Sequence, residues 1–346
     1  MFKRLTDTIR RRPIVGWILF FAIMAGVFLL GLLAASITER RAEIATIYNN
    51  KKTDIPEFET RNEIWGLNFP REYETWAQTA DTSFTSEFNG SHAVDVLAAR
   101  PQMVIFWAGY SFSREYNSPR GHKHAIEDMR AILRTGNPGI DGEGDIQPAT
   151  CWTCKGPDVP RMMHEMGIAN FYKAPWSSMG AEIMNPIGCG DCHDPKTMDL
   201  KITRPALIEA FQRQGKDITK ATPQEMRSLV CAQCHVEYYF KGEGQYLTFP
   251  WDKGMTMEDA EAYYDETDYY DYIHALSRAP ILKAQHPEYE IAQQGIHAQR
   301  GVACADCHMP YKAEGGIKYT AHHSGSISVE CPVEGSKPTI TDCPTE

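Results

Sequence analysis

The sequence lacks an excess of positive charge, because its 346 residues contain 35 Lys and Arg against 45 Asp and Glu, a formal net charge of −10. This balance disfavours a nucleic acid as the partner. The chain also has little of the apolar–polar alternation typical of strands, and no fixed-period repeat beyond its cysteine pairs. With 42% hydrophobic and 23% charged residues it has the composition of a globular protein, which excludes a disordered or collagen-like chain.

Charge is absent from Pro13 to Ile37, a run of 25 residues that as a helix would extend roughly 37 Å and cross a bilayer. Ala34, Ala35 and Ser36 resemble a signal-peptidase site, so residues 1–41 are either a cleaved signal or a basic tip with a retained membrane anchor. The length of the run favours the anchor over a signal, and also over a buried core helix. Five basic residues precede the run and predict a cytoplasmic N-terminus with everything after about Glu39 outside the cytoplasm: Lys3, Arg4, Arg10, Arg11 and Arg12.

Eight of the ten cysteines form four CxxC pairs, and three of the pairs are followed directly by His. CxxCH is the attachment motif of c-type haem, in which the two thiols bond to the vinyl groups and the adjacent imidazole becomes an axial ligand of the iron. The spacing therefore predicts four haem c attachment sites. In order they are Cys151, Cys154 and Lys155; Cys189, Cys192 and His193; Cys231, Cys234 and His235; and Cys304, Cys307 and His308.

Three other uses of paired cysteines fit less well. Zinc ribbons do not require His after the second Cys, and a zinc clip is usually a small structural element. Disulfides suit an oxidising compartment, but four short CxxC loops would be an unusual framework for a chain of this size. A thioredoxin-like redox motif would need a βαβ setting, and none surrounds these pairs.

The first pair differs from the others because Lys155 stands where His is expected. An amine ligates iron only when deprotonated, so the metal and burial must lower its pKa. One reading is a mutated and empty haem site. The other, which we favour, is the catalytic haem, retuned by Lys and open to a substrate on its other face.

The sequence resembles periplasmic cytochrome c nitrite reductase, the ammonia-forming pentahaem enzyme, over roughly residues 60 to 322. Four features carry the resemblance: Cys-Trp-Thr-Cys-Lys at 151–155, the three CxxCH motifs after it, HVEYYF at 235–240 and LKAQHPEYE at 282–290. The resemblance implies six-electron reduction of nitrite to ammonium at the Lys155 haem, with the other haems relaying electrons. It places Arg134, Tyr238 and His286 in the distal pocket. Their chemistry suits an anionic substrate that must be protonated.

The same resemblance implies further ligands. Glu237, the backbone carbonyls of Tyr238 and Lys283, and the side chain of Gln285 would hold a Ca²⁺ ion beside the site, and oxygen atoms are what this cation prefers. Three histidines would serve as distal haem ligands: His122 for the third haem, His322 for the second, and His297 for the fifth.

The pattern departs from the family after His322. The family continues to a fifth CxxCH and a long helical region with the dimer contact, whereas residues 323–346 carry Cys331 and Cys343 with no His after them. These two cysteines either form a disulfide or stay free. We expect a frameshift or premature stop, which would leave the fourth haem short of one ligand and His297 without an iron.

The fold expected is mainly α with long irregular loops, organised around covalently bound haems. Helices are predicted at Lys123–Arg134, Pro205–Arg213, Met257–Ser277 and Tyr289–Gln299, and residues 42–322 are expected to form one multihaem domain. By resemblance the partners are nitrite, a membrane quinol-oxidising cytochrome as electron donor and, in the full-length family, a second subunit. The rival functions are a membrane-tethered electron carrier without substrate chemistry and an inactive truncated product.

Overall fold

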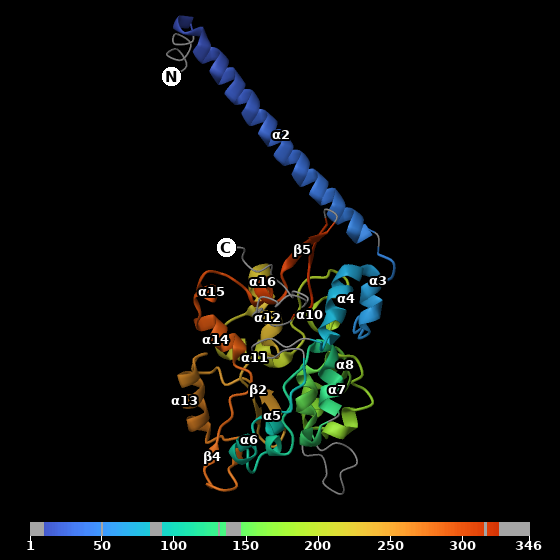
Figure 1. Ribbon diagram of the computed structural model, residues 1–346, viewed down its shortest axis with the longest axis vertical. Coiled ribbons are helices and arrows are strands. Elements are labelled where there is room, and N and C mark those ends of the chain that lie inside the picture. Colours follow the sequence, from blue (N-terminus) through green and yellow to red (C-terminus); the bar gives the residue numbers. More distant parts are fainter. Residues whose placement is uncertain are drawn as a thin grey trace. The chain divides into compact units, whose positions relative to one another are not determined.

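The computed structural model describes residues 10–49, 51–83, 92–130, 132–135, 147–314 and 317–324 of the chain (Figure 1). It divides into two compact units, residues 1–53 and residues 54–346. The two units are taken separately below. Cys331 and Cys343 lie outside the described residues.

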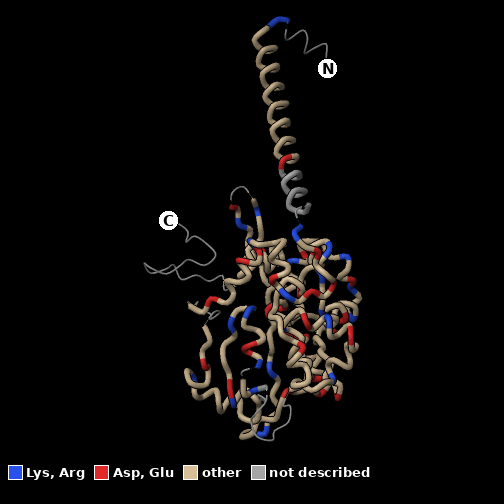
Figure 2. Tube along the Cα trace, turned by 90° about the vertical axis from the view of Figure 1, so that its right-hand side faces the viewer, with Lys and Arg blue, Asp and Glu red and all other residues tan. Residues whose placement is uncertain are grey.

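The first unit is dominated by one helix, α2 (Pro13–Asn49). Its segment Pro13–Glu39 covers 27 residues and is long and apolar enough to span a membrane. Figure 2 shows Lys and Arg at the N-terminal end of this helix and an uncharged stretch after them. The apolar run predicted from the sequence is therefore a continuous helix with exposed apolar side chains.

Short helices and 3₁₀ turns are the main regular elements of the second unit, and long irregular segments join them. The α-helices are α3 (Asn62–Asn68), α4 (Pro70–Ala77), α5 (Val96–Ala99), α6 (Gln102–Phe106), α7 (Ala125–Arg130), α8 (Asp158–Met166), α9 (Ile168–Lys173), α10 (Cys189–Cys192), α11 (Pro205–Arg213), α12 (Pro223–Ala232), α13 (Met257–Thr267), α14 (Glu288–Gln294), α15 (Ile296–Gln299) and α16 (Cys304–His308). The 3₁₀ turns are η1 (Gln78–Ala80), η2 (Ser111–Ser113), η3 (His122–His124), η4 (Leu133–Thr135), η5 (Ala149–Cys154), η6 (Trp176–Met179) and η7 (Ile218–Lys220).

Strands are confined to three antiparallel hairpins in the described residues. They are β1 (Tyr239–Lys241) with β2 (Tyr246–Thr248), β3 (Tyr272–Ile273) with β4 (Pro280–Ile281), and β5 (Tyr311–Glu314) with β6 (Ile317–Thr320). The expected fold class, mainly α with long irregular loops, is confirmed.

Sequence signals place some helix boundaries well. Helix α11 covers the predicted residues Pro205–Arg213, because proline suits the first helical turn and Gly215 follows with a φ of 73°. In α12, Thr222 and Glu225 form a reciprocal capping box.

Three other helix predictions were too long. Helix α13 ends at Thr267, since Asp268 turns left-handed with a φ of 48°, and the chain then forms β3 instead of continuing to Ser277. The stretch from Tyr289 to Gln299 is divided by extended Gly295 into α14 and α15. In the segment from Lys123 to Arg134, the described residues form the end of η3, helix α7 and part of η4, and not one helix.

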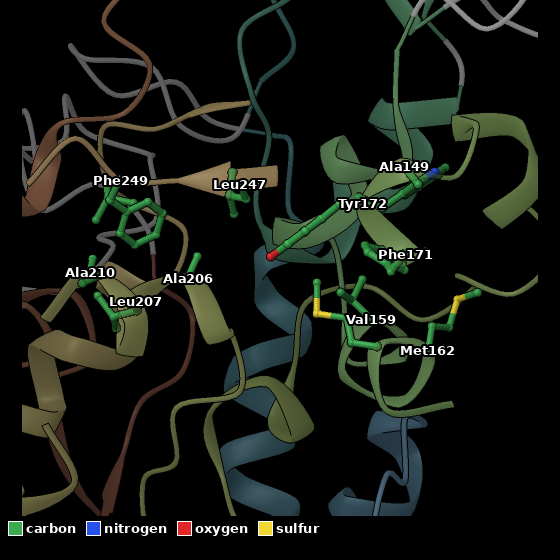
Figure 3. Packing of buried hydrophobic residues seen from close by; sticks show 14 of the residues in the cluster. Ala149, Val159, Met162, Phe171, Tyr172, Ala206, Leu207, Ala210, Leu247 and Phe249 are labelled. Carbon is green, nitrogen blue, oxygen red and sulfur yellow. The ribbon is translucent and has the colours of Figure 1, made fainter. Parts of the chain in front are cut away.

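The core of the second unit packs against Cys151 of the first cysteine pair. Figure 3 shows part of this core. Trp152, inside Cys-Trp-Thr-Cys, is fully buried and stacks on Trp176 with ring centroids 4.9 Å apart. Its indole Nε1 donates to the Trp176 carbonyl oxygen at 3.0 Å. Tyr172 and Leu207 are buried in the same cluster. The first pair is thus positioned by one of the best packed regions of the chain.

Candidate active site and haem-binding residues

The four cysteine pairs each lie in or at the end of a short helical turn. Turn η5 carries Cys151 and Cys154, and helices α10 and α16 carry the second and fourth pairs. The third pair begins in α12 and ends just after it. Because residues three apart in a helix share one face, this geometry turns both sulfurs of a pair toward the same side. All eight thiols are free, so they are not joined as disulfides.

The pairs are also neighbours in space. The Cys154 thiol raises the pKa of Cys234, and the Cys304 thiol together with burial raises the pKa of Cys231. Helices α12 and α16, which carry the third and fourth pairs, pack against each other. The Cys234 thiol also adds to the rise in the pKa of Cys192, which is due first to burial, so the second pair is close as well. The chain therefore gathers the four predicted attachment sites into one cluster.

His193 and His322 face each other across the second pair. Their ring centroids are 6.1 Å apart with an angle of 49° between the ring planes. Each Nδ1 lies 2.8 Å from a backbone carbonyl oxygen, that of Met198 for His193 and that of Thr320 for His322. A carbonyl only accepts, so each Nδ1 carries the proton and each Nε2 keeps a free lone pair. This second contact is what commonly orients a metal-bound imidazole.

His122 and His235 form a similar pair beside the third cysteine pair, with centroids 6.4 Å apart and the same angle of 49°. The Oγ of Ser324 lies 3.2 Å from His122 Nδ1, and Glu288 Oε1 lies 4.0 Å from His235 Nδ1. Burial, then the charges of His235 and Lys155, lower the pKa of His122 to about 4. This ring is therefore neutral at pH 7, as a metal ligand must be.

The residues predicted for the distal pocket converge on the first cysteine pair. The rings of Tyr238 and His286 are 6.3 Å apart and nearly parallel, at 25°. Burial raises the pKa of Tyr238 strongly, and the Cys154 and Cys151 thiols add to the effect because they lie near the phenol. Its hydroxyl is therefore protonated and able to donate.

Arg134 approaches the same place from η4. Its guanidinium lies 4.3 Å from the centre of the Phe112 ring, a cation–π contact. Burial raises the pKa of Cys151 to about 12, and the charge of Arg134 opposes that rise. Lys155 ends the turn that carries this cysteine and is half-buried. The structure thus groups Lys155, Arg134, Tyr238 and His286 around one CxxC pair.

The residues predicted to bind calcium also lie together. Glu237 is buried, and burial raises the pKa of its carboxyl to about 7, while the Gln285 N–H that donates to it acts in the opposite direction. The Lys283 ammonium donates to Gln285 Oε1 at 2.6 Å, and burial lowers the pKa of that lysine to about 8. Asp271 accepts from the Lys283 backbone N–H at 2.7 Å and adds a second carboxylate.

Comparison with known proteins identifies the family. The cytochrome c552 family model matches residues 61–346. A cytochrome c-552 from Porphyromonas gingivalis is 75% identical over 89% of this chain and 62% of its own length, and one from Bacteroides thetaiotaomicron is 68% identical over the same shares. The chain belongs to the cytochrome c552 family.

A solved structure agrees with this family assignment. The cytochrome c nitrite reductase catalytic subunit from Desulfovibrio desulfuricans, described as having two calcium sites, superposes with a TM-score of 0.73 at 36% identity. The superposition covers 79% of this chain and 63% of the solved chain. The cytochrome chain thus spans about 62% of the length of the two curated relatives named above.

The residues of this family member fit haem c. A metal–imidazole nitrogen bond is about 2 Å long, so ring centroids 6.1 and 6.4 Å apart leave room for one metal ion between facing nitrogens. His235 keeps 52% of its side-chain surface exposed, and a flat group against the ring would cover that surface. The oxygen set around Glu237 likewise fits a hard cation, because a second carboxylate, Asp271, lies close to it.

Two predicted ligands of the cytochrome have surroundings that differ from these pairs. His297 is exposed on α15, and His308 is exposed at the end of α16. Their roles stay predictions.

Sequence reasoning missed several groups at this site. Tyr110 stacks on Phe112 at 5.2 Å, and Gln285 lowers the pKa of Tyr110 through a hydrogen bond, although burial raises it more. Glu288 Oε1 lies 3.7 Å from His286 Nδ1 and 4.0 Å from His235 Nδ1, so it stands between two site histidines. Tyr110 belongs to none of the motifs named above. Glu288 lies within LKAQHPEYE, but only folding brings it beside His235, which is far away in the sequence.

Proposed function

We propose that the chain is the haem-binding catalytic part of an ammonia-forming cytochrome c nitrite reductase. The observation that carries this proposal is the grouping of Lys155, Arg134, Tyr238 and His286 around the first cysteine pair. A chain that only carried electrons would gain nothing from a cation, an imidazole and a phenol beside one attachment site. The solved relative is itself a nitrite reductase, which supports the same reading.

In this proposal Cys151 and Cys154 attach the catalytic haem, and the Lys155 amine is its proximal ligand. When bound, the haems supply an open iron for nitrite and a path for six electrons. Nitrite takes up these electrons and several protons and gives ammonium and water. Arg134 attracts the anion and stabilises negative charge as the N–O bonds break, while His286 and Tyr238 hold protons for transfer.

Three further haems are proposed on the CxxCH pairs. His193 and His322 would hold the second haem, and His235 and His122 the third, which gives each iron two imidazoles and leaves it closed to substrate. His308 would be a ligand of the fourth. By resemblance His297 would be a ligand of a fifth haem, for which the sequence has no CxxC pair. These haems would relay electrons to the first.

A calcium ion is proposed at Glu237, the carbonyls of Tyr238 and Lys283, and the Gln285 side chain. It would link the segment that carries Tyr238 to the one that carries His286. The position of the Lys283 ammonium supports this proposal. It donates to Gln285 Oε1, one of the proposed ligand atoms, which shows that this oxygen can face a positive charge. Calcium removal by a chelator should weaken nitrite turnover and leave haem attachment unchanged.

For the chain as a whole we propose a periplasmic location, with residues 1–41 as membrane anchor or signal and residues 42–322 as the multihaem domain. A membrane quinol-oxidising cytochrome would supply electrons, and the full-length protein would form a homodimer.

The decisive experiment replaces Lys155 with Ala in the haem-loaded chain. Nitrite reduction should be lost while mass spectrometry still finds haem on Cys151 and Cys154. Lys173→Ala, which changes an exposed lysine at the end of α9, is the matched control and should keep full activity. Full activity in Lys155→Ala would reject the proposed role.

Binding of nitrite or cyanide distinguishes the proposed enzyme from the rival function, a protein that only carries electrons. A carrier whose irons all have two protein ligands should show no change of its visible spectrum with nitrite or cyanide. The enzyme should show a change that depends on Lys155. An inactive product would bind haem and show no turnover with any electron donor.

A further inference from the structure

Arg204 is a charged residue hidden in the centre of the second unit. It precedes helix α11, and only 1% of its surface is exposed. No motif of the proposed site includes it. A buried guanidinium is costly unless its charge and its N–H groups are paired, so each of its partners is informative.

Two of these partners lie on either side of Lys155. The Arg204 Nε donates to the Thr153 carbonyl oxygen at 2.7 Å, and Nη2 donates to the Gly156 carbonyl oxygen at 3.0 Å. The guanidinium thereby closes the turn of backbone from which the Lys155 side chain projects. A rigid planar fork can hold two carbonyls at once, whereas an ammonium on a flexible stem cannot hold the same geometry.

A third partner belongs to the second cysteine pair. Arg204 Nη2 lies 2.5 Å from Asp191 Oδ1, and the two side chains are 2% and 6% exposed. Asp191 stands inside Cys-Gly-Asp-Cys, where its other carboxylate oxygen accepts from the Gly188 N–H at 2.8 Å. The ion pair therefore connects the Lys155 turn to helix α10.

The third cysteine pair joins the same network through Gln233. Its Oε1 accepts from the Arg204 backbone N–H at 2.9 Å and from the Thr203 backbone N–H at 2.5 Å. Its Nε2 lies 3.3 Å from the Asp191 carbonyl oxygen. Thr203 adds a side-chain link, because its Oγ1 accepts from Arg204 Nη1 at 2.6 Å and donates to the Asp191 carbonyl at 2.8 Å.

One position therefore recurs in three motifs: the residue just before the second cysteine. Thr153, Asp191 and Gln233 occupy it, and each contacts Arg204. Sequence alone shows three unrelated residue types there. The structure shows that one buried residue connects all three: the Arg204 guanidinium contacts Thr153 and Asp191, and its backbone N–H contacts Gln233.

We propose that Arg204 is a positioning residue that holds the first three haem-attachment segments in register and directs the Lys155 amine toward the iron. The proposal rests on the proposed role of Lys155 as proximal ligand. It makes Arg204 part of the machinery of the reaction although it touches neither substrate nor iron.

The test compares Arg204→Lys with Arg213→Lys in the haem-loaded chain. Arg213 ends the helix that Arg204 precedes. It also donates to one carboxylate and one carbonyl, Asp252 Oδ1 at 2.6 Å and Phe249 O at 2.7 Å, but it is partly exposed. Both substitutions keep the charge and lose the planar fork. The readouts are haem content at each cysteine pair, the high-spin electron paramagnetic resonance signal, the midpoint potential of the open haem, and nitrite turnover.

Arg204→Lys should keep four attached haems, reduce the high-spin signal, shift the midpoint potential of the open haem and lower turnover about 10- to 100-fold, as loss of an orienting partner does at metal sites. Arg213→Lys should match the unaltered chain in all four readouts. An unchanged signal and potential in Arg204→Lys, with only lower stability, would overturn the inference and leave Arg204 a structural residue.

Two further variants keep the result interpretable. If Arg204→Lys does not accumulate, Thr203→Val removes the hydroxyl that contacts Arg204 and Asp191, with little change of shape. It should shift the same signal and potential to a smaller extent; no shift would overturn the inference. Lys155→Ala separates the two proposals. A high-spin signal unaffected by Lys155→Ala rejects the proposed function, whereas a signal lost in Lys155→Ala but intact in Arg204→Lys rejects only the positioning role.

Discussion

The second and fourth cysteine pairs have nearly the same sequence, Cys-Gly-Asp-Cys-His and Cys-Ala-Asp-Cys-His, yet they have different surroundings. Locally they match, since the aspartate of each accepts from the N–H just before the first cysteine at 2.8 Å. Asp191 then pairs with Arg204 in the interior, where the two side chains are 6% and 2% exposed, whereas Asp306 pairs with Arg227, where they are 31% and 13% exposed. The same local motif thus places its aspartate in a buried ion pair in one case and in a half-exposed ion pair in the other.

The motif therefore determines the local turn, whereas the tertiary neighbours determine how much the ion pair of the aspartate contributes to stability. Breaking a buried ion pair leaves a charge without a partner or water, while a half-exposed partner is rehydrated. The buried pair belongs to the cluster around the proposed catalytic haem. The half-exposed pair joins α16 to α12, which carries the third cysteine pair.

The largest effect is expected from removing the carboxylates. Asp191→Ala should lower the free energy of unfolding by about 3–5 kcal/mol, because Arg204 stays buried without its counter-charge. Asp306→Ala should lower it by about 1 kcal/mol or less. Guanidinium chloride unfolding of the haem-loaded chain measures both, and equal losses would contradict the difference in surroundings.

A second contrast lies at the residue before the first cysteine. A Cβ on Gly188 would lie 1.9 Å from the Asn62 side-chain oxygen, whereas the fourth pair already has Ala303 there. Gly188→Ala should therefore cost about 1–3 kcal/mol of stability through overpacking. Thermal unfolding of Gly188→Ala, Asn62→Ala and the double variant forms the check: in the double variant the clash should disappear, and additive losses would refute the steric explanation.

The third contrast concerns the N–H of the first cysteine itself. Cys189 N donates to Asn62 Oδ1 at 2.8 Å, and Cys304 N donates to Ser228 Oγ at 3.1 Å. Asn62 is buried, so Asn62→Ala leaves an unpaired group and should cost about 1–2 kcal/mol. Ser228→Ala should cost about 0.5–1 kcal/mol, since its bond is only part-buried. Hydrogen exchange at the two cysteine amides would show which of them opens.

The smallest expected effect is a pH dependence of the half-exposed pair. Burial raises the pKa of Asp306, but the Ala303 N–H, Gln224 and Arg227 together outweigh it, so the pKa is lowered overall. The ionised Asp306 carboxylate therefore stabilises the fold fully above its unfolded-state pKa near 4. This stabilisation disappears as the pH falls through its lower folded-state pKa. Asp306→Asn should be less stable than the unaltered chain by under about 1 kcal/mol at pH 7 and equally stable near pH 2. A difference that persists at pH 2 would show that charge is not the cause.

Much of the fold class and part of the site could be predicted from local patterns. The charge-free run after Pro13, the helix from Pro205 to Arg213 and the four CxxC pairs are all readable, because each depends on residues a few positions apart. Helix ends such as Thr267 were not predicted, since Asp268 adopts a left-handed conformation that few local signals mark.

The sequence by itself determined the turns that carry the cysteines, the amine at Lys155 in place of an imidazole, and the helix long enough to cross a membrane. Only the tertiary structure decided which imidazoles face each other, as His193 does His322, and that Arg204 connects three cysteine pairs. The reason is physical: spacing along a helix is set by three or four neighbouring residues. Burial of a charge and the approach of segments far apart in sequence depend on the packing of the whole unit.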